Sequence, residues 1–171
     1  SKLWSRDEAR DAMTRLCHLV DVYIGNEEDA KDVFGIIADD SDITMGKLSK
    51  DGYKSVAAKL VQQFGFEKVA FTLRSSTSAS DNEWAGILFD GKRCYFSKEY
   101  HLHIVDRVGG GDSFAAGLIH GLLTESEPQA ALEFAVAASA LKHSIEGDFN
   151  RVNVCEVRRL AQGDGSGRVQ R

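Results

Sequence analysis

The residues best suited to chemistry lie between Val105 and Phe114, in the run Val-Asp-Arg-Val-Gly-Gly-Gly-Asp-Ser-Phe. Gly109–Gly111 stands where a predicted strand meets a predicted helix, and backbone N–H groups can converge there because no Cβ obstructs them. The dipole of the following helix adds partial positive charge, so the junction suits an anion such as a phosphoryl group. Asp112 begins the same helix, and a carboxylate beside an anion hole can accept the proton of an alcohol during phosphoryl transfer.

The same segment has two other interpretations. A glycine-rich turn before Asp112 and Ser113 is also typical of a helix N-cap that binds no ligand. The run 111–115 differs by one residue from the nucleophile elbow of serine hydrolases, in which Ser113 would be the nucleophile, and His120 and His143 lie downstream. The nucleophile elbow needs its first glycine tight against the end of the strand and small residues on both sides of the turn. Here three glycines precede Asp112 and Ala115 replaces the last glycine, so the serine hydrolase interpretation is disfavoured.

Strand-like and helix-like segments alternate along the chain and must position these residues. Apolar spacing and capping residues predict helices over 6–19, 27–37, 112–123, 129–143 and 154–161. A further helix is predicted to begin at a cap formed by Ser49 or Asp51, to run to about Phe64 and to end at Gly65. Strands are predicted over 20–24, 68–73, 82–89, 93–97 and 101–105, with a hairpin turn at Asp90-Gly91. Strands that alternate with helices, apart from one hairpin, indicate an α/β sandwich with a largely parallel sheet. The Gly- and Arg-rich tail over 162–171 is expected to fray.

Composition bounds the class of protein. The chain has 171 residues, 43% of them hydrophobic and 27% charged, which suits one ordinary domain with a sizeable core. The net charge of -5 disfavours a broad nucleic-acid-binding face, and no apolar stretch reaches the roughly 20 residues of a membrane span. Cys17, Cys94 and Cys155 are far apart and odd in number. They support neither a disulfide framework nor a zinc ribbon, and we expect a cytoplasmic protein with no membrane partner.

The run 106–117 resembles the second signature of the ribokinase-like, or PfkB, carbohydrate kinases, roughly D-T-x-G-A-G-D-x-F-x-x-G. It departs at Arg107, where the signature has Thr, and at Gly110, where it has Ala. This version is similar to the 2-keto-3-deoxygluconate kinase branch, as are the segments 25–30, 72–74, 143–150 and 166–171. The resemblance covers essentially the whole chain. It implies a ribokinase-like three-layer α/β/α sandwich with a mostly parallel sheet.

The resemblance also implies roles for individual residues. Asp112 would be the catalytic base in contact with the sugar hydroxyl, Gly109, Gly110 and Gly111 would form the anion hole, and Asp148 would contact sugar hydroxyls. The positions that match ATP contacts are Asn26, Thr72, Arg74, Ser75, Gly111, Val136 and Ser139.

Two cation sites are implied in the same way. Asn26 and Asp29 match the family's N-x-x-E motif, which organises Mg2+ and phosphate. Asp29 is one methylene shorter than Glu, so it would reach the metal indirectly, or Glu28 could substitute for it. Asp106 and the Val108 carbonyl match positions that bind a monovalent cation, K+, in some relatives.

Simpler interpretations of these residues stay open. The acidic residues at 27–29 suit any helix N-terminus, and Arg74 suits an ordinary strand end. Val136 and Ser139 suit an alanine-rich packing face, and Asp148 suits a turn after Gly147.

Three further side chains could carry chemistry. His101 and His103 are two apart on a predicted strand and therefore face the same side. They could form a metal pair, but the sequence shows no third ligand, so surface or cleft-lining histidines are preferred. Trp84 is expected to pack in the core rather than to form a stacking platform.

The function implied is ATP- and Mg2+-dependent phosphorylation of 2-keto-3-deoxygluconate at its terminal hydroxyl, with no nucleic-acid partner. Residues 1–171 would be the incomplete C-terminal part of the kinase domain, with the N-terminal part and the lid upstream, so we expect the isolated chain to be inactive. The alternatives are another PfkB-type kinase such as a fructokinase-like enzyme, or a nucleotide-binding fragment without catalysis. Assembly into a homo-oligomer is left open.

Overall fold

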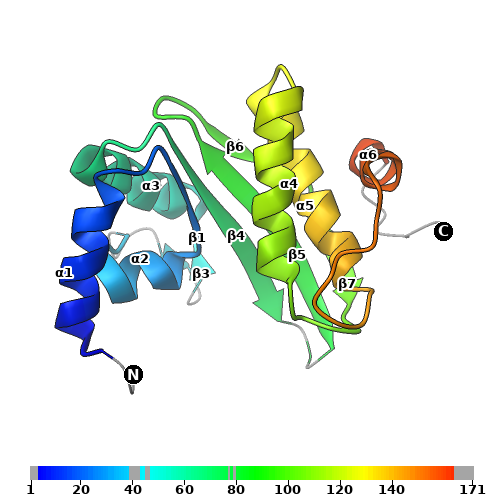
Figure 1. The fold of residues 1–171 in the computed structure, drawn as a ribbon, viewed down its shortest axis with the longest axis horizontal. Coiled ribbons are helices and arrows are strands. Elements are labelled where there is room, and N and C mark those ends of the chain that lie inside the picture. Colours follow the sequence, from blue (N-terminus) through cyan, green and yellow to red (C-terminus); the bar gives the residue numbers. More distant parts are fainter. Residues whose placement is uncertain (1–3, 39–42, 45–46, 77, 79, 164–171) are drawn as a thin grey trace. The chain divides into compact units, whose positions relative to one another are not determined.

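Helices and short strands alternate through the chain, which confirms the α/β class. The computed structural model describes residues 4–38, 43–44, 47–76, 78 and 80–163 (Figure 1). The chain divides into two compact units, one formed by Ser1–Phe71 with Phe89–Cys94 and the other by Thr72–Leu88 with Tyr95–Arg171. Most of the expected tail over 162–171, and the family-like residues 166–171, lie outside the described residues.

The first unit contains α1 (Arg6–Cys17), β1 (Val22–Gly25), α2 (Glu27–Phe34), β2 (Ile43–Thr44), β3 (Lys47–Leu48), α3 (Lys50–Phe64) and the start of β4 (Lys68–Ser76). Ser49 caps α3 by accepting a hydrogen bond from Gly52 N at 3.0 Å, and Gly65 ends the helix, as predicted. α2 is shorter than predicted because Gly35 adopts a left-handed conformation, φ 70°, and terminates it after Phe34.

Aromatic side chains form much of the core of this unit. Tyr23 on β1 stacks on Phe66 at 5.5 Å between ring centroids, and Phe64 lies 5.3 Å from Phe66. β1 and β4 pair in parallel with Tyr23 opposite Val69 and Gly25 opposite Phe71. β1 ends at Gly25, and the chain enters α2 two residues later, at Glu27.

The second unit contains most of β5 (Asp81–Phe89) and the end of β6 (Cys94–Phe96), together with β7 (Tyr100–His103), α4 (Gly110–Thr124), α5 (Pro128–Lys142) and α6 (Val154–Gln162). In the main sheet the strand order is β1-β4-β5-β6, and β7 pairs with β5 in antiparallel orientation. The sheet is therefore mixed, whereas a largely parallel one was predicted. Residues 77–80 and 90–93, which join β4 to β5 and β5 to β6, are far fewer than the dozen or so that a parallel crossover requires.

α4 and α5 pack side by side through small residues (Figure 1). A Cβ at Gly117 would lie 2.9 Å from Ala135 Cα, and one at Gly121 would lie 2.7 Å from Ala131 Cα. The two helices therefore approach closely, and α5 begins at Pro128 as predicted. Among the described helices, none is long and apolar enough to cross a membrane.

Candidate active site

The start of α4 is built on Gly109. This N-cap residue has φ 78° and ψ 0°, a left-handed conformation that strains any residue with a Cβ. A Cβ here would also collide with the backbone carbonyl oxygen of Asp148 and lie 2.9 Å from its Oδ1 atom. Position 109 thus has two independent reasons to be glycine. The second reason places Asp148, a predicted sugar contact, directly at the start of α4.

The first turn of α4 offers backbone N–H groups to a ligand. Within the described part of the chain, α4 has no side-chain cap. The N–H of Ser113 makes the first helical hydrogen bond, to Gly109 O at 2.9 Å, and that of Gly110 donates to Arg107 O at 3.2 Å. The helix ladder leaves Gly111 and Asp112 as first-turn donors. A Cβ at Gly111 would meet no atom within 4 Å, so the space beside these donors is open.

Asp112 itself lies in the first turn of α4 and is exposed. Its carboxylate therefore stands beside the open N–H groups and can be reached by an incoming hydroxyl. The sequence predicted Asp112 as a base beside an anion hole, and that role stays a prediction. Because the Gly110 N–H is used within the turn, the N–H groups left for a ligand are those of Gly111 and Asp112.

Ser139 and His143 support Gly110 from α5 and its C-cap. The Ser139 hydroxyl donates to Gly110 O at 2.7 Å, and a Cβ at Gly110 would lie 2.7 Å from His143 Cε1. His143 Nδ1 lies 2.7 Å from Ser139 O, and Trp84 packs against its ring at 4.7 Å between centroids. Since a carbonyl only accepts, Nδ1 carries the proton in the neutral ring. Trp84 is buried, as expected of a packing residue.

Burial lowers the pKa of His143 below its usual value. The Ser139 carbonyl opposes this shift, while the positive charges of Lys142, Arg107 and Arg74 add to it. Neutral His143 therefore suits a packed support better than a proton carrier.

Asp106 holds the loop that follows α5. Its Oδ2 accepts a hydrogen bond from Gly147 N at 2.9 Å, and its Oδ1 accepts one from Val108 N at 3.0 Å. These two bonds lower the pKa of Asp106, since they favour the charged carboxylate. The predicted cation ligand thus already ties the 143–150 loop to the segment that leads into α4.

Asn150 fastens the other end of the same loop. Its Nδ2 donates to Ser113 Oγ at 2.6 Å and to Ala138 O at 3.0 Å. Ser113 in turn donates to Ala138 O at 3.1 Å and is only 7% exposed. A buried hydroxyl used in this way is a poor nucleophile, which argues against the serine hydrolase interpretation.

The remaining predicted ATP contacts differ in exposure. Thr72 and Ser75 are half-buried on β4, and Arg74 is exposed. Val136 is fully buried, and its side chain lies against Gly86, where a Cβ would be only 2.9 Å from Val136 Cγ2. Packing accounts for Val136 as well as for Ser139, whose hydroxyl bonds Gly110. A nucleotide contact for either remains a prediction.

The predicted magnesium residues lie in the first unit, at the start of α2. Asn26 Oδ1 accepts a hydrogen bond from Asp29 N at 2.8 Å, and Asp29 Oδ2 accepts one from Asn26 N at 3.0 Å. This reciprocal capping box is the simpler role that the sequence left open. Glu28 is exposed beside it.

Sequence reasoning missed the supporting roles of Asn150, His143 and Asp106. Each role depends on a contact between segments well separated along the chain, such as the 37 positions between Asn150 and Ser113. Contacts of this kind cannot be predicted from the residues next to each other in the sequence. The nearest signal was the family-like run 143–150, which pointed to the right loop without its anchoring bonds.

An open helix start lined by glycine, with an exposed carboxylate in its first turn, is a setting that suits a phosphoryl group. Residues 1–150 match the family described as "pfkB family carbohydrate kinase". The chain therefore belongs to the PfkB carbohydrate kinase family.

Individual relatives share both sequence and fold with the chain. It is 29% identical over 167 residues to a 2-dehydro-3-deoxygalactonokinase of Haloferax volcanii, covering 98% of this chain and 46% of that protein. The crystal structure of 2-dehydro-3-deoxygluconokinase from Thermotoga maritima is 41% identical with a TM-score of 0.85, over 95% of this chain and 47% of that one. A PfkB family carbohydrate kinase from Listeria grayi is 34% identical with a TM-score of 0.78, over 95% and 47%. The ribokinase-like fold is thus confirmed, and the chain spans about half the length of these relatives.

Proposed function

We propose that this chain supplies the phosphoryl-transfer half of an ATP-dependent kinase that phosphorylates 2-keto-3-deoxygluconate at its terminal hydroxyl. The observation that carries the proposal is the exposed Asp112 beside the open N–H groups at Gly111. Asp148, whose backbone lies against the N-cap residue Gly109 of the same helix, would accept hydrogen bonds from a sugar bound there. The start of α4 and the adjoining 143–150 loop would thus offer groups for both reactants.

The chemistry follows from these groups. Asp112 accepts the proton of the sugar hydroxyl while that oxygen forms a bond to the γ-phosphorus and the bond from phosphorus to the ADP oxygen breaks. The N–H dipoles at Gly111 and Asp112 stabilise the negative charge on the transferred group. Because they are already oriented by the helix, they need no reorganisation during the reaction.

ATP and its metal ion would be held by residues that the family resemblance names. Arg74, Thr72 and Ser75 would contact the phosphates, and a guanidinium is well suited to bind them. The capping box uses only one oxygen of Asp29, so its second oxygen, together with Glu28, would hold Mg2+ through water. Mg2+ neutralises phosphate charge when bound.

A monovalent cation would be held by Asp106 and the Val108 carbonyl. The charged carboxylate of Asp106, whose two oxygens also accept the N–H groups of Val108 and Gly147, would attract K+. The free thiols Cys17, Cys94 and Cys155 suit a reducing compartment, so we place the protein in the cytoplasm.

The substrate class follows from the names of the relatives. The Haloferax volcanii and Thermotoga maritima proteins are named for 2-keto-3-deoxy sugar acids that differ in the configuration of the sugar. We therefore propose a sugar acid of this class, with 2-keto-3-deoxygluconate first. Since the chain spans 46–47% of these relatives, we expect the 171-residue chain alone to show little or no turnover.

An ADP-formation assay with Mg-ATP tests the proposal on this chain and on the longest natural protein that contains it. The substrates are 2-keto-3-deoxygluconate, 2-keto-3-deoxygalactonate and fructose. Asp112→Asn is expected to lower turnover of the longer protein by about 10²–10⁴-fold, the usual worth of a general base. Ser113→Ala, the comparison variant next to it, removes only a hydroxyl that anchors the 143–150 loop, so it is expected to lower turnover far less than Asp112→Asn.

Each alternative predicts a different result. A fructokinase-like enzyme would prefer fructose, and a nucleotide-binding protein without catalysis would bind ATP and form no ADP with any sugar. Loss of activity in Ser113→Ala with full activity in Asp112→Asn would overturn the assignment of the base. Robust turnover by the 171-residue chain alone would overturn the claim that it holds only half of the site.

A further inference from the structure

One exposed face of the β5–β7 ladder carries both histidines of the His-Leu-His run. In the antiparallel register Glu83 lies opposite His101, and Asp81 lies opposite His103. Residues two apart on a strand face the same side of the sheet, so all four side chains share this face. The face therefore presents two cross-strand pairs, each made of a carboxylate and an imidazole.

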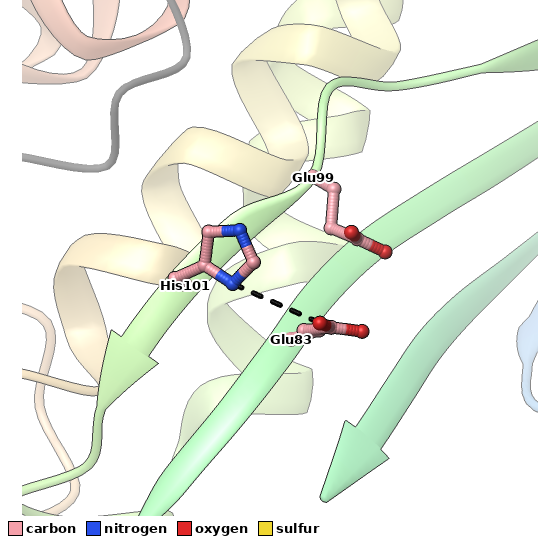
Figure 2. Close-up of side chains that lie close together, drawn as sticks. All are labelled: Glu83, Glu99 and His101. Carbon is pink, nitrogen blue, oxygen red and sulfur yellow. Dashed lines mark ion pairs between the residues drawn. The ribbon is translucent and has the colours of Figure 1, made fainter. Parts of the chain in front are cut away.

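A third ligand joins only one of these pairs. Glu99 precedes β7, and its carboxylate, that of Glu83 and a ring nitrogen of His101 all lie within 4.8 Å of one another. Figure 2 shows the three side chains close together, Glu83 on β5, His101 on β7 and Glu99 just before β7, with His101 Nδ1 3.8 Å from Glu83 Oε1. The sequence suggested a pair of the two histidines without a third ligand; the structure instead groups His101 with Glu99, two residues before it, and with Glu83 from the paired strand.

We propose that Glu83, Glu99 and His101 form a binding site for a divalent transition-metal ion, with Zn2+ as the best-suited ion. Imidazole nitrogen and carboxylate oxygen bind Zn2+ at about 2.0–2.2 Å, so its ligand atoms lie within about 3.5 Å of one another. His101 is 72% and Glu83 32% exposed at the side chain, so small rotations close the remaining gap. Two carboxylates supply the negative charge that a divalent ion requires, and water can complete the coordination.

This site is distinct from the Mg2+ site of the proposed kinase reaction. Magnesium prefers an all-oxygen octahedron and keeps much of its water, whereas imidazole favours Zn2+ and its neighbours in the transition series. The metal would join β5 to β7 and stabilise their pairing. The inference does not depend on the proposed function.

The second pair provides a matched control. His103 Nδ1 is bonded to Asp81 Oδ1 at 2.8 Å, and Asp81 also accepts a hydrogen bond from Ser78 Oγ at 2.7 Å. These bonds lower the pKa of Asp81 and occupy both of its oxygens. Among the described residues, no third ligand stands beside this pair. His103 is thus the same residue type on the same strand and face, outside the proposed site.

Isothermal titration of the metal-free chain with ZnCl2 tests the proposal. The titration uses a Cys155→Ser background, because that thiol is exposed and can bind zinc itself, and a large excess of Mg2+. We expect one Zn2+ per chain with micromolar affinity. His101→Ala and Glu99→Gln should each weaken it at least tenfold, His103→Ala should leave it unchanged, and acid should weaken it because protonated imidazole cannot ligate.

Circular dichroism of each variant separates loss of the site from loss of the fold, and exposed Glu99→Gln provides a second variant if His101→Ala is poorly folded. Three results would overturn the proposal: no stoichiometric binding, binding that survives both His101→Ala and Glu99→Gln, or an equal loss in His103→Ala. The last result would instead indicate a site shared by the two histidines.

Discussion

Replacing Gly109 with alanine tests the close approach of Asp148 to the start of α4. At φ 78° the alanine adopts a left-handed conformation, which costs about 1–2 kcal/mol. Its Cβ also meets the Asp148 backbone carbonyl, and relief of such overpacking costs about 1–3 kcal/mol more. The free energy of unfolding should therefore fall by about 2–5 kcal/mol, a large share of the total stability of a domain.

Gly111→Ala is the matched control. It adds the same methyl group two residues further on, where no atom lies within 4 Å. Alanine favours a helix over glycine by about 0.5–1 kcal/mol, so this variant should be as stable as the parent or slightly more stable. The same methyl group lies in the space proposed for phosphate, so Gly111→Ala should weaken ATP binding while Gly109→Ala acts mainly through stability.

Urea unfolding followed by circular dichroism measures both variants, with a constant slope as the test that only stability has changed. Isothermal titration with ATP then compares their folded states. If Gly109→Ala loses no more than about 1–2 kcal/mol, which the left-handed conformation costs by itself, Asp148 does not pack on the helix start. The assignment of Asp148 to the site would then fail with it.

Two further predictions concern the support of the site. Burial lowers the pKa of His143 below 6.5, so below that pH the unfolded chain binds more protons and the free energy of unfolding falls with acidification. His143→Gln should flatten this dependence in urea unfolding between about pH 7 and pH 5, and an unchanged profile would contradict the argument. Asn150→Ala removes the bonds to Ser113 and Ala138 and should cost about 1–3 kcal/mol. It should also speed amide hydrogen exchange at 147–149, and unchanged exchange there would show that Asn150 does not hold the loop.

Much of the fold was predictable from the sequence because helix ends are encoded locally. Ser49 and Gly65 bound α3 as predicted, since an N-cap hydroxyl and a left-handed C-terminal residue act within one turn. α2 was predicted too long because its apolar pattern continues past Gly35, whose left-handed conformation ends the helix. The α/β class came from the alternation of elements, and the mixed sheet followed from connections too short for a crossover.

The site was predictable only in part, for a related reason. Asp112 and the glycines before it are contiguous, so their chemistry could be inferred from the order of residues alone. The contacts of Asp148 with Gly109, and of Glu99 with Glu83, require the chain to return from a distant segment. Local sequence patterns do not show which distant segments will come into contact.

The adjacent residues Asp112 and Ser113 show how one helical turn separates two roles. Successive side chains of an α-helix point about 100° apart, so Asp112 is exposed while Ser113 is turned inward. The inward hydroxyl binds Ala138 and receives Asn150, which holds the loop that carries Asp148. The run that resembles a hydrolase elbow therefore uses its serine to hold the loop and leaves the Asp112 carboxylate exposed, as the proposed base requires. Exchanging the two residues by the double substitution Asp112→Ser with Ser113→Asp should abolish ADP formation by the longer protein and, in urea unfolding, lower stability because it buries an unpaired carboxylate. Asp112→Asn alone should lower ADP formation and leave the stability and the loop unchanged.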